Sequence, residues 1–94
     1  MLRAAVYQGP SIRCDTPAVL LVVEESLRQA SQQEVDIVQF PELFLCGYDI
    51  SPEETARSAI GVDSEEMSAL TALATKHGVA IGIGYAEVDN GKIY

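Results

Sequence analysis

The sequence predicts an α/β fold that contains only part of a sheet. Strand-like apolar runs alternate with amphipathic helical stretches over 94 residues, in the order β-α-β-α-α-β-turn-β. Capping residues, prolines and glycines mark the boundaries between these stretches. The last run, residues 92–94, is too short to cover the strand edge before it, which is a liability in a finished domain. We therefore expect residues 1–94 to be one portion of a single longer domain.

The first strand and the first helix follow from local signals. Residues 2–8 alternate weakly, and a Gly-Pro pair ends the run. Asp15 can cap a helix that has Pro17 in its first turn and that runs to about Gln33. Four apolar positions share one face of this helix at helical spacing: Leu20, Val23, Leu27 and Ala30.

The second strand is expected at residues 35–40. Its valine and isoleucine content is typical of a strand covered on both faces. Residues 51–54 read Ser-Pro-Glu-Glu, a capping box that predicts a short helix.

A third helix should begin at residues 63–66, where the acidic side chains suit its positive end. Gly78 should end this helix. Its apolar stripe consists of Met67, Leu70, Leu73 and Ala74. Residues 79–85 predict a third strand, whose glycines indicate a close approach of another backbone segment. Asn90 and Gly91 suit the positive φ angles of a type I′ hairpin turn.

The composition excludes several classes of partner. Fourteen acidic and six basic residues leave a net charge of −8, which argues against binding to nucleic acid. No apolar run is long enough to cross a bilayer, and no signal peptide is recognisable. We expect a cytoplasmic protein with neither a nucleic-acid nor a membrane partner.

Glu42 is the residue that points to chemistry. It lies in the segment FPELFLCGY, just after the second strand. Ligands and catalytic groups gather at the carboxyl ends of strands in α/β sheets. The apolar neighbours should desolvate the carboxylate, and desolvation makes a carboxylate a better general base. A surface glutamate that opens a loop is the other interpretation, and the residues alone favour neither.

The same segment resembles a signature of the carbon–nitrogen hydrolase (nitrilase) superfamily. Four further segments resemble that family in the same order, and together they extend over essentially the whole chain: residues 2–8, 35–38, 73–79 and 82–94. The resemblance implies the N-terminal part of an α-β-β-α sandwich. It also implies hydrolysis of non-peptide carbon–nitrogen bonds in small amides, carbamoyl compounds or nitriles, with no metal and no organic cofactor.

The resemblance further implies a Glu-Lys-Cys triad, in which Glu42 matches the catalytic glutamate. Such a base removes the proton of a thiol and later activates water. Tyr48 resembles a residue beside the substrate pocket, although it could equally be a packing aromatic. Members of the family often form homo-oligomers, so the full-length protein is expected to do the same.

The family's lysine and nucleophilic cysteine lie beyond residue 94. Neither Lys76 nor Lys92 matches that lysine, and both are expected on the surface. Cys46 is close to Glu42 but has apolar and acidic neighbours, so we expect it to pack; Cys14 also matches no nucleophile. We therefore expect this chain to supply only the glutamate and to be inactive alone.

Two alternatives stay open. One is a non-catalytic, truncated α/β module. The other is a small thiol-sensing domain that uses Cys14 and Cys46. These cysteines are distant in the sequence and show no Cys-x-x-Cys motif or metal-ligand spacing, so no motif supports that alternative. A structural disulfide is not expected in a reducing cytosol.

Overall fold

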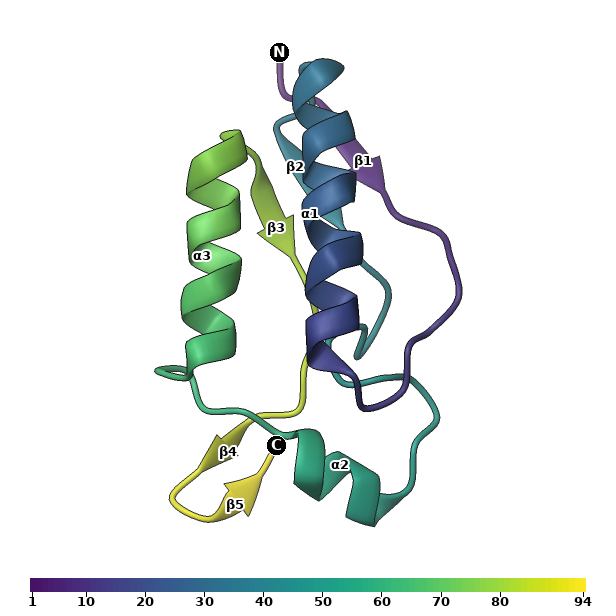
Figure 1. Ribbon diagram of the computed structural model, residues 1–94, viewed down its shortest axis with the longest axis vertical. Helices are drawn as coiled ribbons and strands as arrows, with labels where there is room; N and C mark the ends of the chain where they lie inside the picture. Colours follow the sequence, from purple (N-terminus) through teal and green to yellow (C-terminus); the bar gives the residue numbers. More distant parts are fainter.

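A parallel sheet lies at the centre of the structure, a computed structural model that describes all residues from 1 to 94. It contains three strands in the order β1-β2-β3 (Figure 1). Their bounds are Ala4–Val6 for β1, Ile37–Gln39 for β2 and Ala80–Gly82 for β3. Each neighbouring pair is parallel, so the carboxyl ends of all three strands lie at one edge. The predicted α/β class is confirmed.

The strands are shorter than the sequence predicts. The apolar runs extend beyond the ladder on both sides, but regular pairing covers only three residues in each strand. At one end, Asp36 is bound to Arg3, because its carboxylate accepts a hydrogen bond from the Arg3 N–H at 2.7 Å. At the other end, the Phe40 N–H still donates to the Gly82 carbonyl at 2.8 Å before the chain turns.

Helix α1 (Thr16–Gln32) begins where its sequence signals indicate. The Asp15 carboxylate accepts a hydrogen bond from the Ala18 N–H, and a proline occupies the first turn. The buried face differs by one position from the predicted one. Val19 is fully buried, together with Val23, Leu27 and Ala30, whereas Leu20 is only partly buried. Two valines four residues apart place the stripe slightly further round the helix.

Helices α2 (Pro52–Ser58) and α3 (Glu65–His77) follow the predicted signals. Ser51 and Glu54 form both hydrogen bonds of the capping box that begins α2. Ser64 caps α3, and Gly78 ends it in the left-handed conformation with φ of 64°. Leu70 is buried on the predicted stripe of α3.

Both long helices lie side by side on the same face of the sheet (Figure 1). Val38 of β2 is buried beneath them, while Gln39 is exposed on the opposite side. The prediction that β2 is covered on both faces is therefore wrong for this chain, because α1 and α3 pack on one face only. The main core comprises Val19, Val23, Leu27, Ala30, Val38, Phe40, Phe44, Leu45, Ile60, Leu70 and Val79.

The C-terminal hairpin forms a separate small sheet. Strands β4 (Val88–Asp89) and β5 (Lys92–Ile93) pair around Asn90 and Gly91, whose φ angles of 51° and 77° confirm the predicted turn. Residues 92 and 93 pair with β4 and not with β3. After Gly82 the chain instead runs beside the segment that contains Glu42, and it reaches α2 before the hairpin starts (Figure 1).

The structure has no helix with the length and apolar character that a membrane span requires.

Candidate functional site

The site lies at the carboxyl edge of the parallel sheet, where β2 ends in a series of turns. The Phe44 N–H donates to the Pro41 carbonyl at 3.2 Å, and the Gly47 N–H donates to the Leu43 carbonyl at 2.8 Å. Leu43 has a φ of 53°, in the left-handed region that a bulky residue rarely adopts. These turns hold Glu42 three residues beyond the last residue of β2.

Three aromatic rings support these turns from below. The ring centroids of Phe40 and Phe44 are 5.4 Å apart, and Tyr7 from the end of β1 lies 5.4 Å from the first and 5.2 Å from the second. These separations are typical of favourable aromatic packing. Phe40 and Phe44 are almost completely buried. The segment is thus anchored on both sides of Glu42.

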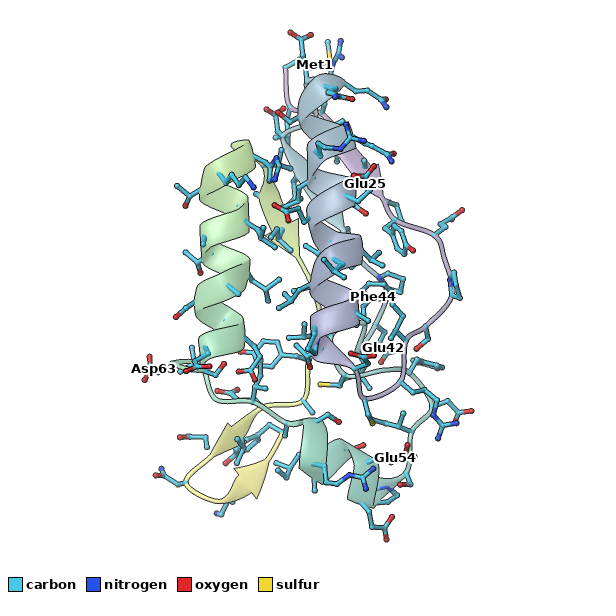
Figure 2. The ribbon with its side chains drawn as sticks, in the orientation of Figure 1. Met1, Glu25, Glu42, Phe44, Glu54 and Asp63 are labelled. Carbon is cyan, nitrogen blue, oxygen red and sulfur yellow. The ribbon has the colours of Figure 1, made fainter.

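Glu42 itself is exposed. The expectation that its apolar neighbours desolvate the carboxylate is therefore wrong for this chain. The reason is geometric: the turn directs Phe40 and Phe44 into the core, so the intervening residue faces outward. Glu42 and Phe44 are both labelled in Figure 2.

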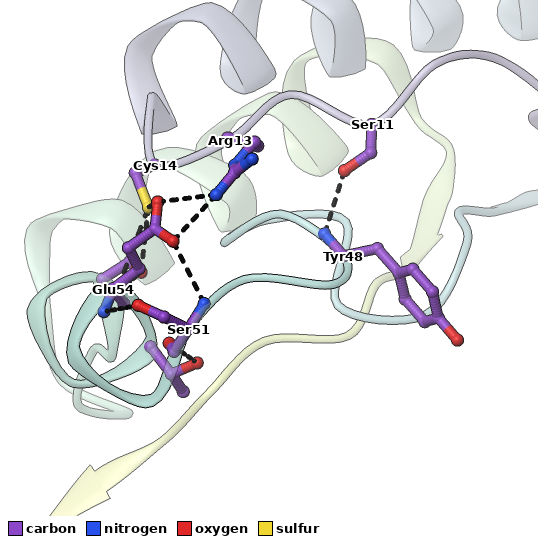
Figure 3. Close-up of polar contacts among 8 residues, drawn as sticks. Ser11, Arg13, Cys14, Tyr48, Ser51 and Glu54 are labelled. Carbon is purple, nitrogen blue, oxygen red and sulfur yellow. Dashed lines mark hydrogen bonds and ion pairs between the residues drawn. The ribbon is translucent and has the colours of Figure 1, made fainter.

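The two residues singled out from the sequence, Glu42 and Tyr48, line one hollow. Its volume is about 340 Å³, and its walls are formed by Gly9, Ser11, Pro41, Glu42, Phe44 and Tyr48. Tyr48 is 55% exposed, so it is not a packing aromatic of the core. Its backbone N–H donates to the Ser11 hydroxyl at 2.9 Å (Figure 3).

Sequence reasoning missed the contribution of Gly9, Ser11 and Phe44 to this hollow. A usable signal was present, because Gly9 and Ser11 follow the first strand directly. The carboxyl ends of parallel strands meet at one edge of a sheet, so the loop after the first strand belongs beside the loop after the second.

The loop after β1 is joined to α2 by charged and polar contacts (Figure 3). Arg13 makes an ion pair with Glu54 at 2.8 Å, and Glu54 also accepts a hydrogen bond from the Ser51 N–H at 3.1 Å. The Ser51 N–H, followed by the Arg13 guanidinium, holds the pKa of Glu54 below its ordinary value. This carboxylate is therefore structural: it holds the loop after β1 against α2 and does not itself line the hollow.

The remaining candidates lie away from the hollow. Lys76 is exposed and pairs with Glu24 at 2.9 Å. Lys92 is exposed in the hairpin. Cys46 is buried, and its sulfur accepts a hydrogen bond from the Ala86 N–H at 3.3 Å, whereas Cys14 is exposed. Burial raises the pKa of the Cys46 thiol, so the structure disfavours Cys46 as the nucleophile that attacks a substrate.

Comparison with known proteins identifies the family of this fold. A family model described as carbon-nitrogen hydrolase matches residues 3–94. A bifunctional nitrilase/nitrile hydratase of Nicotiana tabacum is 33% identical over 110 residues, which cover 99% of this chain and 32% of that protein. A hydrolase of Pseudomonas protegens is 32% identical over 94 residues, which cover 99% of this chain and 32% of that protein. The chain thus spans about a third of the length of the curated relatives that it matches.

Solved structures agree on the fold. An amidase from Nesterenkonia sp. superposes with a TM-score of 0.71 at 22% identity, over 94% of this chain and 33% of that chain. A mutant of the Nesterenkonia AN1 amidase, described as a member of the nitrilase superfamily, also gives 0.71, at 19% identity, over 99% of this chain and 41% of that chain. The α/β architecture with a partial sheet is the one expected from the sequence, and the match over residues 3–94 shows that this chain belongs to the carbon-nitrogen hydrolase family.

Proposed function

We propose that the complete protein hydrolyses non-peptide carbon–nitrogen bonds in small amide or carbamoyl substrates and releases ammonia. The observation that supports this most directly is the position of Glu42. It stands beyond the carboxyl end of a parallel strand, on an anchored turn, and lines a hollow together with Tyr48, in a chain that belongs to a hydrolase family.

In this proposal Glu42 is the general base of a Glu-Lys-Cys triad whose lysine and cysteine come from beyond residue 94. Glu42 accepts the thiol proton, and the thiolate attacks the substrate carbonyl carbon. The lysine stabilises the charge that develops on the carbonyl oxygen. Ammonia leaves with a proton returned by Glu42, and a thioester remains. Glu42 then takes a proton from water, which attacks the thioester and releases the acid and the thiol.

The exposure of Glu42 sets a condition on this proposal. A carboxylate in open water is a weak general base, whereas removal from water brings its proton affinity closer to what catalysis near neutral pH needs. Further residues of the protein must therefore close the hollow over Glu42. Tyr48 would then line the substrate pocket, and the present chain alone would be inactive.

Nitrile hydrolysis is the second candidate, and the relatives supply the observation for it. Several proteins that this chain resembles bear the name nitrilase. We prefer an amide to a nitrile substrate only because amide hydrolysis is the commoner activity in this family.

The test is a Glu42→Gln substitution in the complete protein, with ammonia release from propionamide and propionitrile as the measurement. Loss of a general base should lower the rate by about 10²–10⁴-fold. Glu53→Gln, an exposed glutamate of α2 outside the hollow, is the matched control and should retain activity. Unchanged ammonia release by the Glu42→Gln protein would refute the assignment.

Two further experiments follow from the same proposal. The 94-residue chain alone should release no ammonia; release that Glu42→Gln abolishes would show that the triad is not required. We also propose that the complete protein is a cytoplasmic homo-oligomer. Sedimentation velocity of the complete protein checks its assembly, and a single monomeric species would contradict it.

The non-catalytic alternative makes the opposite prediction for the complete protein. A module that only folds or associates would release no ammonia from either substrate, with or without Glu42. A complete protein that lacks a downstream lysine and cysteine would support that alternative.

A further inference from the structure

The fold brings together the two cysteines that are distant in the sequence. The Cys14 N–H donates to the Cys46 carbonyl at 2.9 Å. With standard backbone bond lengths, a single N–H···O=C hydrogen bond of this length keeps the two Cα atoms within roughly 6.8 Å of each other. Disulfides in proteins join Cα atoms that are roughly 4.4–6.8 Å apart. The backbone at these two cysteines therefore already has the spacing that a disulfide needs.

The two sulfur atoms also approach the same residue. Cys14 Sγ lies 3.8 Å from the Ser58 hydroxyl oxygen, and Cys46 Sγ lies 3.4 Å from the Ser58 carbonyl oxygen. Both thiols are free in this structure. Each side chain thus points from its own loop toward the C-terminal end of α2.

Their surroundings make the two thiols chemically different. Cys14 is exposed, so it is open to reagents, and its sulfur lies 3.8 Å from a Glu54 carboxylate oxygen. Cys46 is only 1% exposed. Cys14 also has a φ of 49°, which is uncommon for a residue other than glycine, and the hydrogen bond to Cys46 helps to hold it there. This arrangement of one accessible and one sheltered thiol suits an attacking and a resolving cysteine.

We propose that Cys14 and Cys46 form a reversible disulfide when the protein meets a peroxide or a low-molecular-weight disulfide. With a peroxide, the Cys14 thiolate attacks one oxygen, the O–O bond breaks, and Cys14 becomes a sulfenic acid. The Cys46 sulfur then attacks the Cys14 sulfur, the S–O bond breaks, and water leaves. In total, two thiols lose two electrons and two protons, and hydrogen peroxide becomes two molecules of water.

The disulfide would join the two walls of the hollow that contains Glu42. Ser11 and Tyr48 lie on the loops that carry Cys14 and Cys46, and these loops are already linked by the bond from the Tyr48 N–H to Ser11 (Figure 3). Oxidation would hold the loops together covalently. Any effect on catalysis rests on the proposed function, but disulfide formation itself does not.

The experiment oxidises the reduced chain with oxidised glutathione, in native buffer and in concentrated urea. Free thiols are counted, and the intact mass is measured. We expect both thiols to disappear together, with a mass loss of two hydrogen atoms, no covalent dimer, and full reversal by dithiothreitol. The native reaction should be about tenfold faster than the reaction in urea, because the folded chain holds the thiols together.

Single substitutions distinguish the two cysteines. The Cys46→Ser chain should stop at a glutathione adduct on Cys14, and the Cys14→Ser chain should leave Cys46 largely unreacted. Equal rates with and without urea, covalent dimers, or a stable glutathione adduct on the unsubstituted chain would each overturn the proposal. These readouts do not depend on ammonia release, so a failure here leaves the proposed hydrolase function untouched.

Discussion

At the scale of single residues, the turn that carries Glu42 depends on one glycine of a distant segment. The Leu45 N–H donates to the Gly84 carbonyl at 3.2 Å, which draws the chain after β3 against the turn. A Cβ atom at Gly84 would lie only 2.8 Å from the Leu43 backbone nitrogen. The close backbone approach predicted from the glycines of residues 79–85 is confirmed here, and it brings Gly84 against the residue that has the positive φ.

A Gly84→Ala substitution should therefore destabilise the protein by about 1–3 kcal/mol, since one of two backbone segments must move. Urea denaturation measures this change. Gly61→Ala is the matched control, because its added Cβ would be 3.7 Å from the nearest atom, an ordinary contact. Equal stabilities of the two variants would show that Gly84 has no special packing requirement.

At the scale of elements, the short helix α2 is the support for the loop after β1. The Ser51 hydroxyl accepts the Glu54 N–H at 3.1 Å, and the Glu54 carboxylate returns a bond to the Ser51 N–H. The same carboxylate makes the ion pair with Arg13. Because the cap orients Glu54, the start of α2 and the loop beside the hollow should respond together to any change in the cap.

Replacing Ser51 with alanine should lower the free energy of unfolding by about 1 kcal/mol, because the Glu54 N–H loses its acceptor. The amides of the loop at residues 9–14 should also exchange faster with solvent, since Glu54 would hold Arg13 less firmly. Ser68→Ala, at an exposed position of α3, is the control and should change neither quantity. Faster exchange confined to α2 would contradict the coupling between the two elements.

At the scale of the whole molecule, the sheet is a layer with one covered face and one open face. Helices α1 and α3 cover one face of the sheet. The side chains of Ala5, Val38 and Ile81 lie on that face, and the strand register aligns these three residues. The opposite side carries mostly small and apolar residues: Ala4, Val6, Ile37, Gln39, Ala80 and Gly82. In an α-β-β-α sandwich such a face packs against a second sheet, so its composition agrees with the family.

An ion pair joins the two covering helices. Lys76 of α3 donates to Glu24 of α1 at 2.9 Å, and the His77 ring nitrogen lies 3.4 Å from the same carboxylate oxygen. The Lys76 hydrogen bond, followed by that of His77, lowers the pKa of Glu24 from its ordinary value of 4.5. A lowered folded-state pKa means that the pair stabilises the protein above pH 4.5 and that this contribution is lost as the pH falls through the folded-state value.

Glu24→Gln should accordingly lower the melting temperature slightly at pH 7, and the difference from the unsubstituted protein should vanish in acid. The double substitution Glu24→Gln and Lys76→Gln should lower the melting temperature by less than the sum of the two single substitutions. These four proteins form a double-mutant cycle. Glu25→Gln replaces Glu24→Gln in the control cycle, because Glu25 pairs with Arg28 inside α1. The effects of Glu25→Gln and Lys76→Gln should therefore be additive. Additivity in both cycles would show that the interhelical pair contributes nothing.

The sequence by itself determined most of the elements and the position of the candidate base. Capping residues, prolines and glycines act within a few residues, so both ends of α1 and α3, the start of α2 and the turn at Asn90 and Gly91 could be predicted accurately. The segment around Glu42 carried its own family signature, which pointed to the carboxyl end of β2.

Only the tertiary structure decided which segments share a neighbourhood. Four features depend on partners that are distant in the sequence: the length of the strands, the open face of the sheet, the exposure of Glu42 and the separate hairpin. The backbone hydrogen bond between Cys14 and Cys46 and the close approach of Gly84 to Leu43 also depend on such distant partners. Local patterns encode the conformation of a segment, whereas burial and contact depend on how segments pack, and no periodicity or cap records that packing.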